Sequence, residues 1–227
     1  MNSIARLFQD IIDELRNVLA GSGFADSIIP PIVFAVLNAV AGLQSAIWGS
    51  LLFVLLIVTF RLIRRQPLKF AIGGLGGVVL AVLVASLLGR AEGYFLPGIF
   101  SGVVTIFVAV VSAVIGRPMV AWTSHIARRW PLDWYWHPRV RPAYSEVTWM
   151  WAVFFAVRSL LQYAVLRGGS VEQLALTNLV TGWPATVVLL VMSYIYGMWR
   201  LKNLKGPSVE EFKAGIEPPW QGQLKGF

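Results

Sequence analysis

The chain has 227 residues, of which 57% are hydrophobic and 13% are charged, and its formal charge is +8. This apolar content predicts an integral membrane protein and excludes a soluble domain that binds nucleic acid. The absence of cysteine excludes disulfides, thiolate metal sites, iron–sulfur clusters and cysteine nucleophiles.

Residues 1–23 are predicted to form an amphipathic helix at the membrane interface. Apolar residues recur at helical spacing from Ile4 to Leu19, Ser3 is a suitable N-cap, and glycine ends the pattern. The polar face lacks the basic excess of a helix that binds anionic lipid. Two interpretations stay open: a helix that lies in the interface or packs under the bundle, and a contact for a protein partner or a dimer.

Residues 24–200 are predicted to form an all-α transmembrane domain with six helices. All the apolar stretches except the short first one are long enough to cross a hydrocarbon layer of ~30 Å. The expected spans are residues 28–43, 45–62, 68–88, 96–115, 147–166 and 174–198. Of the nineteen Lys and Arg residues, all but three fall on the side of the N-terminus. The three exceptions are Arg90, Arg158 and Arg167. Because basic loops stay in the cytoplasm, both termini are expected there.

Prolines predict local features of these spans. Pro30 and Pro31 are expected in the first turn of the first span, where a missing N–H costs little. Pro184 is expected to kink the last span and to free a backbone carbonyl. The polar tail, residues 201–227, is expected to be a mostly irregular cytoplasmic extension.

Glycines at small-xxx-small spacing mark the third and fourth spans as packing helices. They are Gly73 with Gly77, and Gly98 with Gly102. This spacing favours close contact with neighbouring helices or with a second protomer. A glycine-lined passage for a substrate is the alternative.

The segment between the fourth and fifth spans is rich in tryptophan and arginine, which is typical of a segment at headgroup level. We expect a cytoplasmic interfacial belt of one short helix and an extended stretch, in contact with anionic headgroups. The belt residues are Trp122, Arg128, Arg129, Trp130, Trp134 and Trp136.

Candidate catalytic groups are few. His125, His137 and Asp133 match no zinc spacing, and no carboxylate lies in the central part of a span. Signatures for nucleophilic catalysis and for phosphate binding are also missing. The chain is therefore expected to be neither an enzyme nor a protein with a metal or a cofactor.

Arg158 lies in the middle of the fifth span, where a charge costs ~2.5 to 3.5 kcal/mol on insertion scales. Gln162 follows four residues later on the same helix face, and the other polar residues within the bundle are Asn38, Asn178 and Thr181. Two interpretations stay open. One is an internal network in which Arg158 donates to helix carbonyls and to Asn178 or Asn38, and the other is a site for an anion or an anionic lipid group.

Several short motifs carry a resemblance to a known family. They are Asp26 with Pro31 and Phe34, Gly73-Gly74 with Gly77-Val78, Phe95-Leu96-Pro97-Gly98-Ile99, Arg117-Pro118, Thr148-Trp149 with Phe154, Arg158 with Gln162, and Gly182-Trp183-Pro184. From about residue 20 to 200 the chain resembles an uncharacterised family of six-helix bacterial, mainly actinobacterial, membrane proteins known as a domain of unknown function. More distantly, it is similar to intracellular septation protein A. The resemblance implies the bacterial cytoplasmic membrane, and no reaction, substrate or cofactor.

Together these features predict a non-enzymatic membrane protein, a candidate homodimer, that acts in envelope organisation or as a membrane partner. The alternative is a small transporter or channel with a polar intramembrane site around Arg158. The two hypotheses differ in one requirement, because a transporter needs a cavity beside Arg158 that water can reach.

Overall fold

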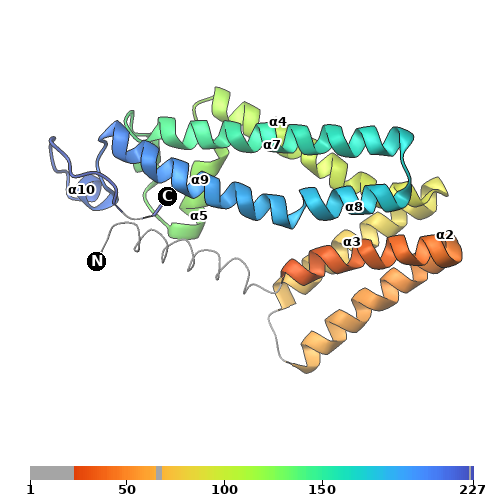
Figure 1. Cartoon of the computed structure of the whole chain (residues 1–227). Coiled ribbons are helices and arrows are strands. Elements are labelled where there is room, and N and C mark those ends of the chain that lie inside the picture. The colour runs from red at the N-terminus through yellow and green to blue at the C-terminus, as the bar shows by residue number, and fades with distance from the viewer. Residues whose placement is uncertain (1–22, 65–67, 225) are drawn as a thin grey trace. The chain divides into compact units, whose positions relative to one another are not determined.

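The computed structural model describes residues 23–64, 68–224 and 226–227, and this part of the chain is all-α (Figure 1). The helices in chain order are α2 (Gly23–Ile63), α3 (Leu68–Leu88), the 3-10 helix η1 (Ala91–Phe95), α4 (Leu96–Val114), α5 (Met119–Arg128), α6 (Leu132–Trp136), α7 (Arg141–Gly168), α8 (Val171–Thr181), α9 (Trp183–Leu204) and α10 (Val209–Lys213). The amphipathic helix predicted for residues 1–23 lies outside the described residues, apart from Gly23.

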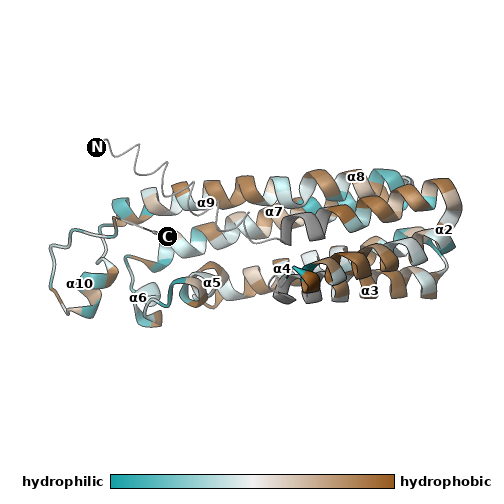
Figure 2. Ribbon diagram, turned by 90° about the horizontal axis from the view of Figure 1, so that it is seen from below, coloured by the Kyte–Doolittle hydropathy of each residue, from teal (hydrophilic) through white to brown (hydrophobic). Residues whose placement is uncertain are grey.

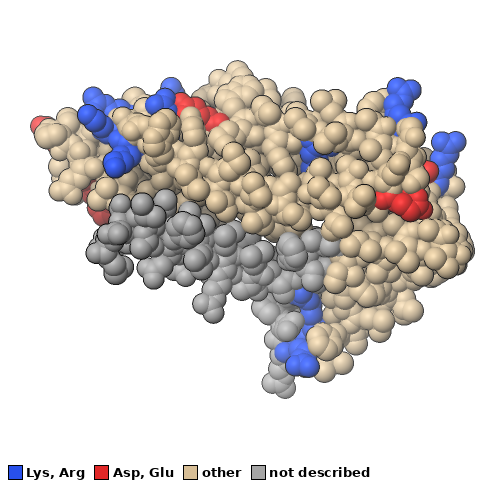
Figure 3. Space-filling view, in the orientation of Figure 1, with Lys and Arg blue, Asp and Glu red and all other residues tan. Residues whose placement is uncertain are grey.

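Apolar residues run along most of the long helices, as the brown ribbon of α3 and α4 in Figure 2 shows. On the face drawn in Figure 3, broad stretches of surface carry no Lys, Arg, Asp or Glu. Four stretches are long and apolar enough to cross a membrane: Ile29–Ile63, Ala91–Val114, Arg141–Gly168 and Val171–Leu204. The all-α prediction is confirmed for the described residues, and four candidate spans stand where six were predicted.

α2 contains two helices, which meet at Gly42. This residue has φ 78° and ψ 176°, a conformation that only glycine adopts without strain. The chain turns back at this point (Figure 1), so the predicted boundary near residues 43–45 corresponds to a real change of direction. The prediction for the prolines was wrong: α2 begins at Gly23, so Pro30 and Pro31 lie inside the helix and not in its first turn.

The chain forms two compact units, and the first comprises Met1–Ser101 with Arg158–Val187. Its core includes Phe34 of α2, whose ring stacks on Tyr94 of η1 with 4.0 Å between centroids and meets the edge of Phe95. A Cβ on Gly93 would stand 2.9 Å from the Cα of Ala85, so η1 approaches α3 too closely for a larger residue. These contacts hold α2, α3 and η1 together, and Leu174 and Ala175 of α8 belong to the same core.

The last apolar stretch is divided into α8 and α9. α8 begins with a capping box in which the Ser170 hydroxyl accepts from the Gln173 amide and the Gln173 side chain accepts from the Ser170 amide. It ends at Gly182, whose ψ of −125° breaks the helix. Pro184 then lies in the first turn of α9, where its missing N–H is not needed. The predicted kink is therefore a full break, two residues before the proline.

The second unit comprises Gly102–Val157 with Val188–Phe227, and its core is an aromatic cluster. Trp134, Tyr135 and Tyr144 are fully buried and meet edge to face. The predicted extended stretch after the first short helix is wrong: α6 follows α5, and α7 begins at Arg141, six residues before the expected start of the span.

Most described residues of the tail are irregular, and its side chains pack into this cluster. The Phe227 ring stacks on Tyr144 with 4.4 Å between centroids, and the Trp134 indole donates to the Pro207 carbonyl at 2.9 Å. Amide donors, first Ser208 and then Gln221, hold the pKa of the Glu211 carboxyl below its ordinary value. The tail is therefore a folded part of the second unit.

Candidate functional site

Arg158 and Gln162 of α7 both donate to the side chain of Asn178 on α8. The Arg158 Nη2 lies 2.9 Å from the Asn178 Oδ1, and the Gln162 Nε2 lies 3.2 Å from the same oxygen. The four-residue spacing makes this possible, since it places both α7 side chains on one helix face. Gln162 is buried, whereas Arg158 and Asn178 are half-buried. One amide oxygen thus links α7 to α8.

The other two polar residues of the predicted set lie apart from this group. The Thr181 hydroxyl donates to the carbonyl of Thr177 in its own helix at 2.7 Å, which satisfies it locally. Asn38 is half-buried on α2 and does not line the cavity beside Arg158. The structure therefore brings together Arg158, Gln162 and Asn178 and leaves Thr181 and Asn38 outside.

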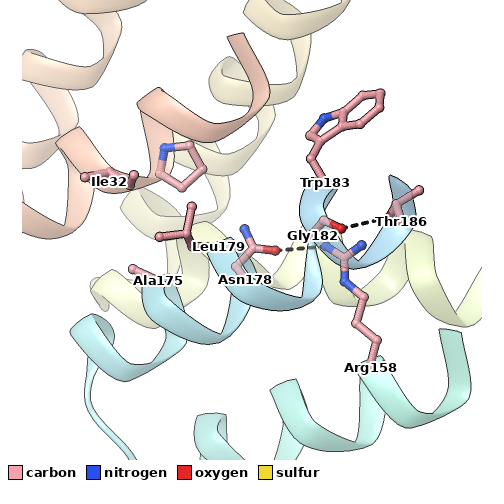
Figure 4. A pocket seen from close by; sticks show the side chains of 9 residues that line it. Ile32, Arg158, Ala175, Asn178, Leu179, Gly182, Trp183 and Thr186 are labelled. Atoms are coloured by element: carbon pink, nitrogen blue, oxygen red, sulfur yellow. Dashed lines mark hydrogen bonds between the residues drawn. The ribbon is translucent and has the colours of Figure 1, made fainter. Parts of the chain in front are cut away.

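A cavity of about 250 Å³ lies beside the Arg158 guanidinium (Figure 4). Residues of α2, α7, α8 and α9 line it, all within the first unit. Ile32 and Leu179 form an apolar side, while Asn178, Gly182 and Thr186 contribute polar atoms. The volume is just below the range of about 300–1,000 Å³ that is typical of small-molecule sites, so it fits a small group.

The break between α8 and α9 forms one wall of this cavity. Gly182 and Trp183 both line it, and the Thr186 amide and hydroxyl both donate to the Gly182 carbonyl, at 3.0 and 2.8 Å. At this break the C-terminus of α8, where the helix dipole is negative, meets the N-terminus of α9, where it is positive. The net positive charge of the cavity therefore comes from the Arg158 guanidinium.

Among the residues that the structure describes, no carboxylate pairs with Arg158, and Asn178 Oδ1 is its one acceptor. Guanidinium has five N–H donors, so the protein meets only part of its capacity. Glu172 and Glu92 line other hollows in the first unit. An anion in the cavity would supply the missing charge and acceptors.

The glycines of the predicted packing motifs differ in their surroundings. A Cβ on Gly77 or on Gly98 would meet nothing within 4 Å, so neither makes a close helix contact with the part of the chain that the structure describes. Gly102 is buried, and the side-chain surroundings of Gly73 lie outside the described residues.

The residues of the predicted interfacial belt differ in how far they are buried. Trp134 is wholly buried in the aromatic cluster, and Trp130 and Trp136 are half-buried. Arg128 donates to the Phe227 carbonyl at 3.0 Å, so it serves the fold of the tail. Trp122 and Arg129 are exposed and keep the surface position that the belt requires.

Comparison with known proteins gives one match. A family model described as "Protein of unknown function (DUF3159)" matches residues 20–201, which is most of the chain. The chain belongs to this family. No curated protein and no solved structure matches it. The DUF3159 region contains Arg158, Gln162, Asn178 and the α8–α9 break, so the whole cavity lies inside the family's domain.

Sequence reasoning missed most of the residues that line the cavity, among them Ile32 and Thr186. Thr186 carried a usable signal, because a hydroxyl residue soon after Gly-Trp-Pro in an apolar run can bind the carbonyl that a helix break frees. Ile32 carried none, since its place depends on how α2 packs against α8.

Sequence reasoning also missed an ion pair within the second unit. Arg200 binds both carboxylate oxygens of Glu146, with a shortest distance of 2.7 Å, and Tyr196 donates to the same group. It links the first turns of α7 to the last turns of α9, and no charge of the candidate site takes part in it.

Proposed function

We propose that this DUF3159 protein is a small membrane transporter that binds an anion at Arg158. The observation that carries the proposal is a half-buried arginine beside a 250 Å³ cavity, with one protein acceptor and no carboxylate partner among the described residues. A charge inside a membrane span marks a functional site by default, because the free-energy cost of burying it must be offset by a partner or a ligand. Transporters also commonly bind substrates at broken helices, where half-helix N-termini face anionic groups.

The proposal includes six crossings of the bacterial cytoplasmic membrane, with both termini in the cytoplasm. Gly42 divides the 35-residue stretch Ile29–Ile63 into two helices, and α3 has 21 residues, which supports six crossings from four candidate stretches. The charge asymmetry of the sequence supports the orientation. We propose neither enzymatic activity nor a cofactor.

The test is ligand-dependent stability of the purified protein in lipid nanodiscs. Acetate, phosphate and sulfate are titrated at constant ionic strength, and thermal unfolding is followed for the native chain and for Arg158→Gln. Binding to the folded state adds about 2.7 kcal/mol at a ligand concentration of 100 Kd. A rise in Tm with at least one anion that disappears in Arg158→Gln supports the site, and no rise with any anion refutes it.

Transport itself is tested in proteoliposomes with the anion that binds most tightly. Uptake that requires the native chain and fails with Arg158→Gln supports transport. Binding without uptake would leave a binding protein and would refute the transport step. Asn38→Leu is the matched control, since Asn38 is a polar residue of the bundle that does not line the cavity.

A second candidate, a partner-binding role in envelope organisation, is favoured by the open glycine faces. Gly77 and Gly98 lie exposed on α3 and α4, with room for another helix to approach. Gly77→Leu and Gly98→Leu should then lower self-association in lipid. If the native chain and both variants are all monomeric in lipid, the partner-binding role is refuted.

Contact with anionic headgroups on the cytoplasmic face is part of the proposal. On α5, Trp122 is 42% and Ile126 is 74% exposed, and Arg117 and Arg129 are exposed nearby. Aromatic and basic side chains of this kind suit the headgroup level. Quenching of Trp122 fluorescence by headgroup-labelled lipid, compared with Trp122→Phe, measures this contact.

A further inference from the structure

An apolar groove adjoins the Arg158 cavity within the first unit. The groove has a volume of about 330 Å³ and lies between α2 and α8, with Ala35 and Ala39 on one side and Leu176 on the other. Ile32 and Leu179 line both the groove and the Arg158 cavity, as Ala175 does. The two hollows therefore lie next to each other and together make one candidate site.

The two parts of this site differ in chemistry. The cavity contains a guanidinium, an amide and a helix break, whereas every residue that lines the groove is apolar except Glu172. A hydrated inorganic anion would fill the cavity and leave the groove without a ligand. With about 30 Å³ for each water-sized group, the groove accommodates roughly ten groups of methylene size.

Charge fixes the direction in which a ligand would lie. Arg158 attracts an anion at the cavity end, and the exposed carboxylate of Glu172 repels one at the far end of the groove. Glu172 and Asn178 are six residues apart on α8, which corresponds to about 9 Å along the helix. An acidic head at Arg158 with an apolar chain that runs toward Glu172 pairs the guanidinium and keeps the two negative charges apart.

We propose that the ligand is an acidic amphiphile, whose anionic head binds Arg158 and whose alkyl chain lies in the groove. This inference rests on the proposed anion site and adds the class of the anion. A free alkyl acid and a bilayer lipid share this chemistry. Each methylene that leaves water for the groove should tighten binding by up to about fourfold.

The experiment compares acetate, decanoate and decanol as thermal-shift ligands in phosphatidylcholine nanodiscs. Two groove variants are matched: Ala39→Phe fills the groove without touching the Arg158 cavity, and Ala41→Phe makes the same change at an exposed residue that lines neither hollow. We expect decanoate to bind at least tenfold more tightly than acetate. Ala39→Phe should remove this advantage and leave acetate binding unchanged, while Ala41→Phe should keep it.

The outcomes separate this inference from the anion site itself. Decanoate that binds no more tightly than acetate, or equally in Ala39→Phe, overturns the inference and leaves the anion site standing. No Arg158-dependent binding of any anion removes the anion site and the inference with it. Decanol that binds as well as decanoate also overturns the inference, because the acidic head would then contribute nothing.

A last arm identifies the source of the amphiphile. In phosphatidylglycerol nanodiscs without added acid, stabilisation that depends on Arg158 supports the inference and assigns the site to a bilayer lipid. Equal stability in the two lipids, together with tight decanoate binding, supports it and assigns the site to a free alkyl acid. Because Ala39 lies outside the polar group, its variant keeps the test decisive even if Arg158→Gln does not fold.

Discussion

Replacing Asn178 with leucine removes the one oxygen that joins α7 to α8 through polar side chains. Asn178 Oδ1 accepts from Arg158 at 2.9 Å and from Gln162 at 3.2 Å, and both bonds are lost together. Polar bonds between membrane helices contribute about 0.6 kcal/mol on average and up to about 1.7 kcal/mol. A buried donor that is left without a partner costs about 1–3 kcal/mol.

The two donors should respond differently to this change. Gln162 is only 3% exposed, so its amide would stay unpaired, whereas Arg158 lies beside a cavity and can bind water or an anion instead. Most of the cost should therefore come from Gln162, and Asn178→Leu should destabilise the protein by about 2–3 kcal/mol.

Reversible unfolding in mixed micelles measures this cost, and a double-mutant cycle divides it. Asn178→Leu with Gln162→Leu together should cost at least about 1 kcal/mol less than the sum of the single changes. Thr181→Val is the control, because Thr181 bonds within its own helix, and it should cost less than about 0.5 kcal/mol. A cost below about 0.5 kcal/mol for Asn178→Leu, or strict additivity in the cycle, would refute the reasoning.

Three further changes test the fold around the site. Gly182→Ala should destabilise by about 1–3 kcal/mol in the same assay, because its Cβ would collide with a carbonyl oxygen of the preceding turn, whereas Gly98→Ala should be neutral within about 0.5 kcal/mol. Phe227→Ala should cost about 2 kcal/mol, less than a fully buried Phe, because it removes the stack on Tyr144; near-UV circular dichroism reports the cluster. The pKa of Glu211 is lowered from 4.5, so the ionised carboxylate stabilises the folded tail fully above that pH, and this stabilisation is lost as the pH falls toward the lowered value. Proteolysis of the tail should therefore be faster at about pH 4 than at about pH 7, and this difference should be smaller in Glu211→Gln.

Apolar length predicted the helices well, because a membrane helix needs a continuous run of about 20 apolar residues. α3 begins and ends at the predicted residues, Leu68 and Leu88. The turn near residue 43 was also predictable, because the first apolar run ends at Gly42 and glycine can adopt the non-helical conformation that a turn needs. α7 was predicted to begin late because its first residues are polar and aromatic and belong to the second unit's core.

The break in the last span shows how a local signal can be placed slightly wrongly. Pro184 lacks an N–H, and its ring excludes the carbonyl four residues earlier, so the sequence predicted a kink at the proline. The chain resolves the conflict earlier, at Gly182, where a non-helical ψ costs least. The proline then starts a new helix.

The polar site was only half predictable. Asn178 was one of two asparagines that the sequence offered to Arg158, and spacing on α7 could not choose between them. The choice depends on packing between helices that are distant in sequence. The burial of Trp134 depends on the tail, whose Pro207 accepts from its indole, and no local pattern encodes that contact.

The central claim is that Arg158 binds an external anion. Asn178→Asp tests it most directly, because it places a carboxylate where an oxygen already lies 2.9 Å from Arg158 Nη2. The measurement is the anion-induced rise in Tm for the native chain, for Asn178→Asp and for Asn38→Asp in the same nanodiscs. We expect Asn178→Asp to fold at least as stably as the native chain and to lose the anion-induced rise. Asn38→Asp, the same change at a residue that does not line the cavity, should keep the rise. An undiminished rise in Asn178→Asp would contradict the claim, because the anion would then bind somewhere other than Arg158.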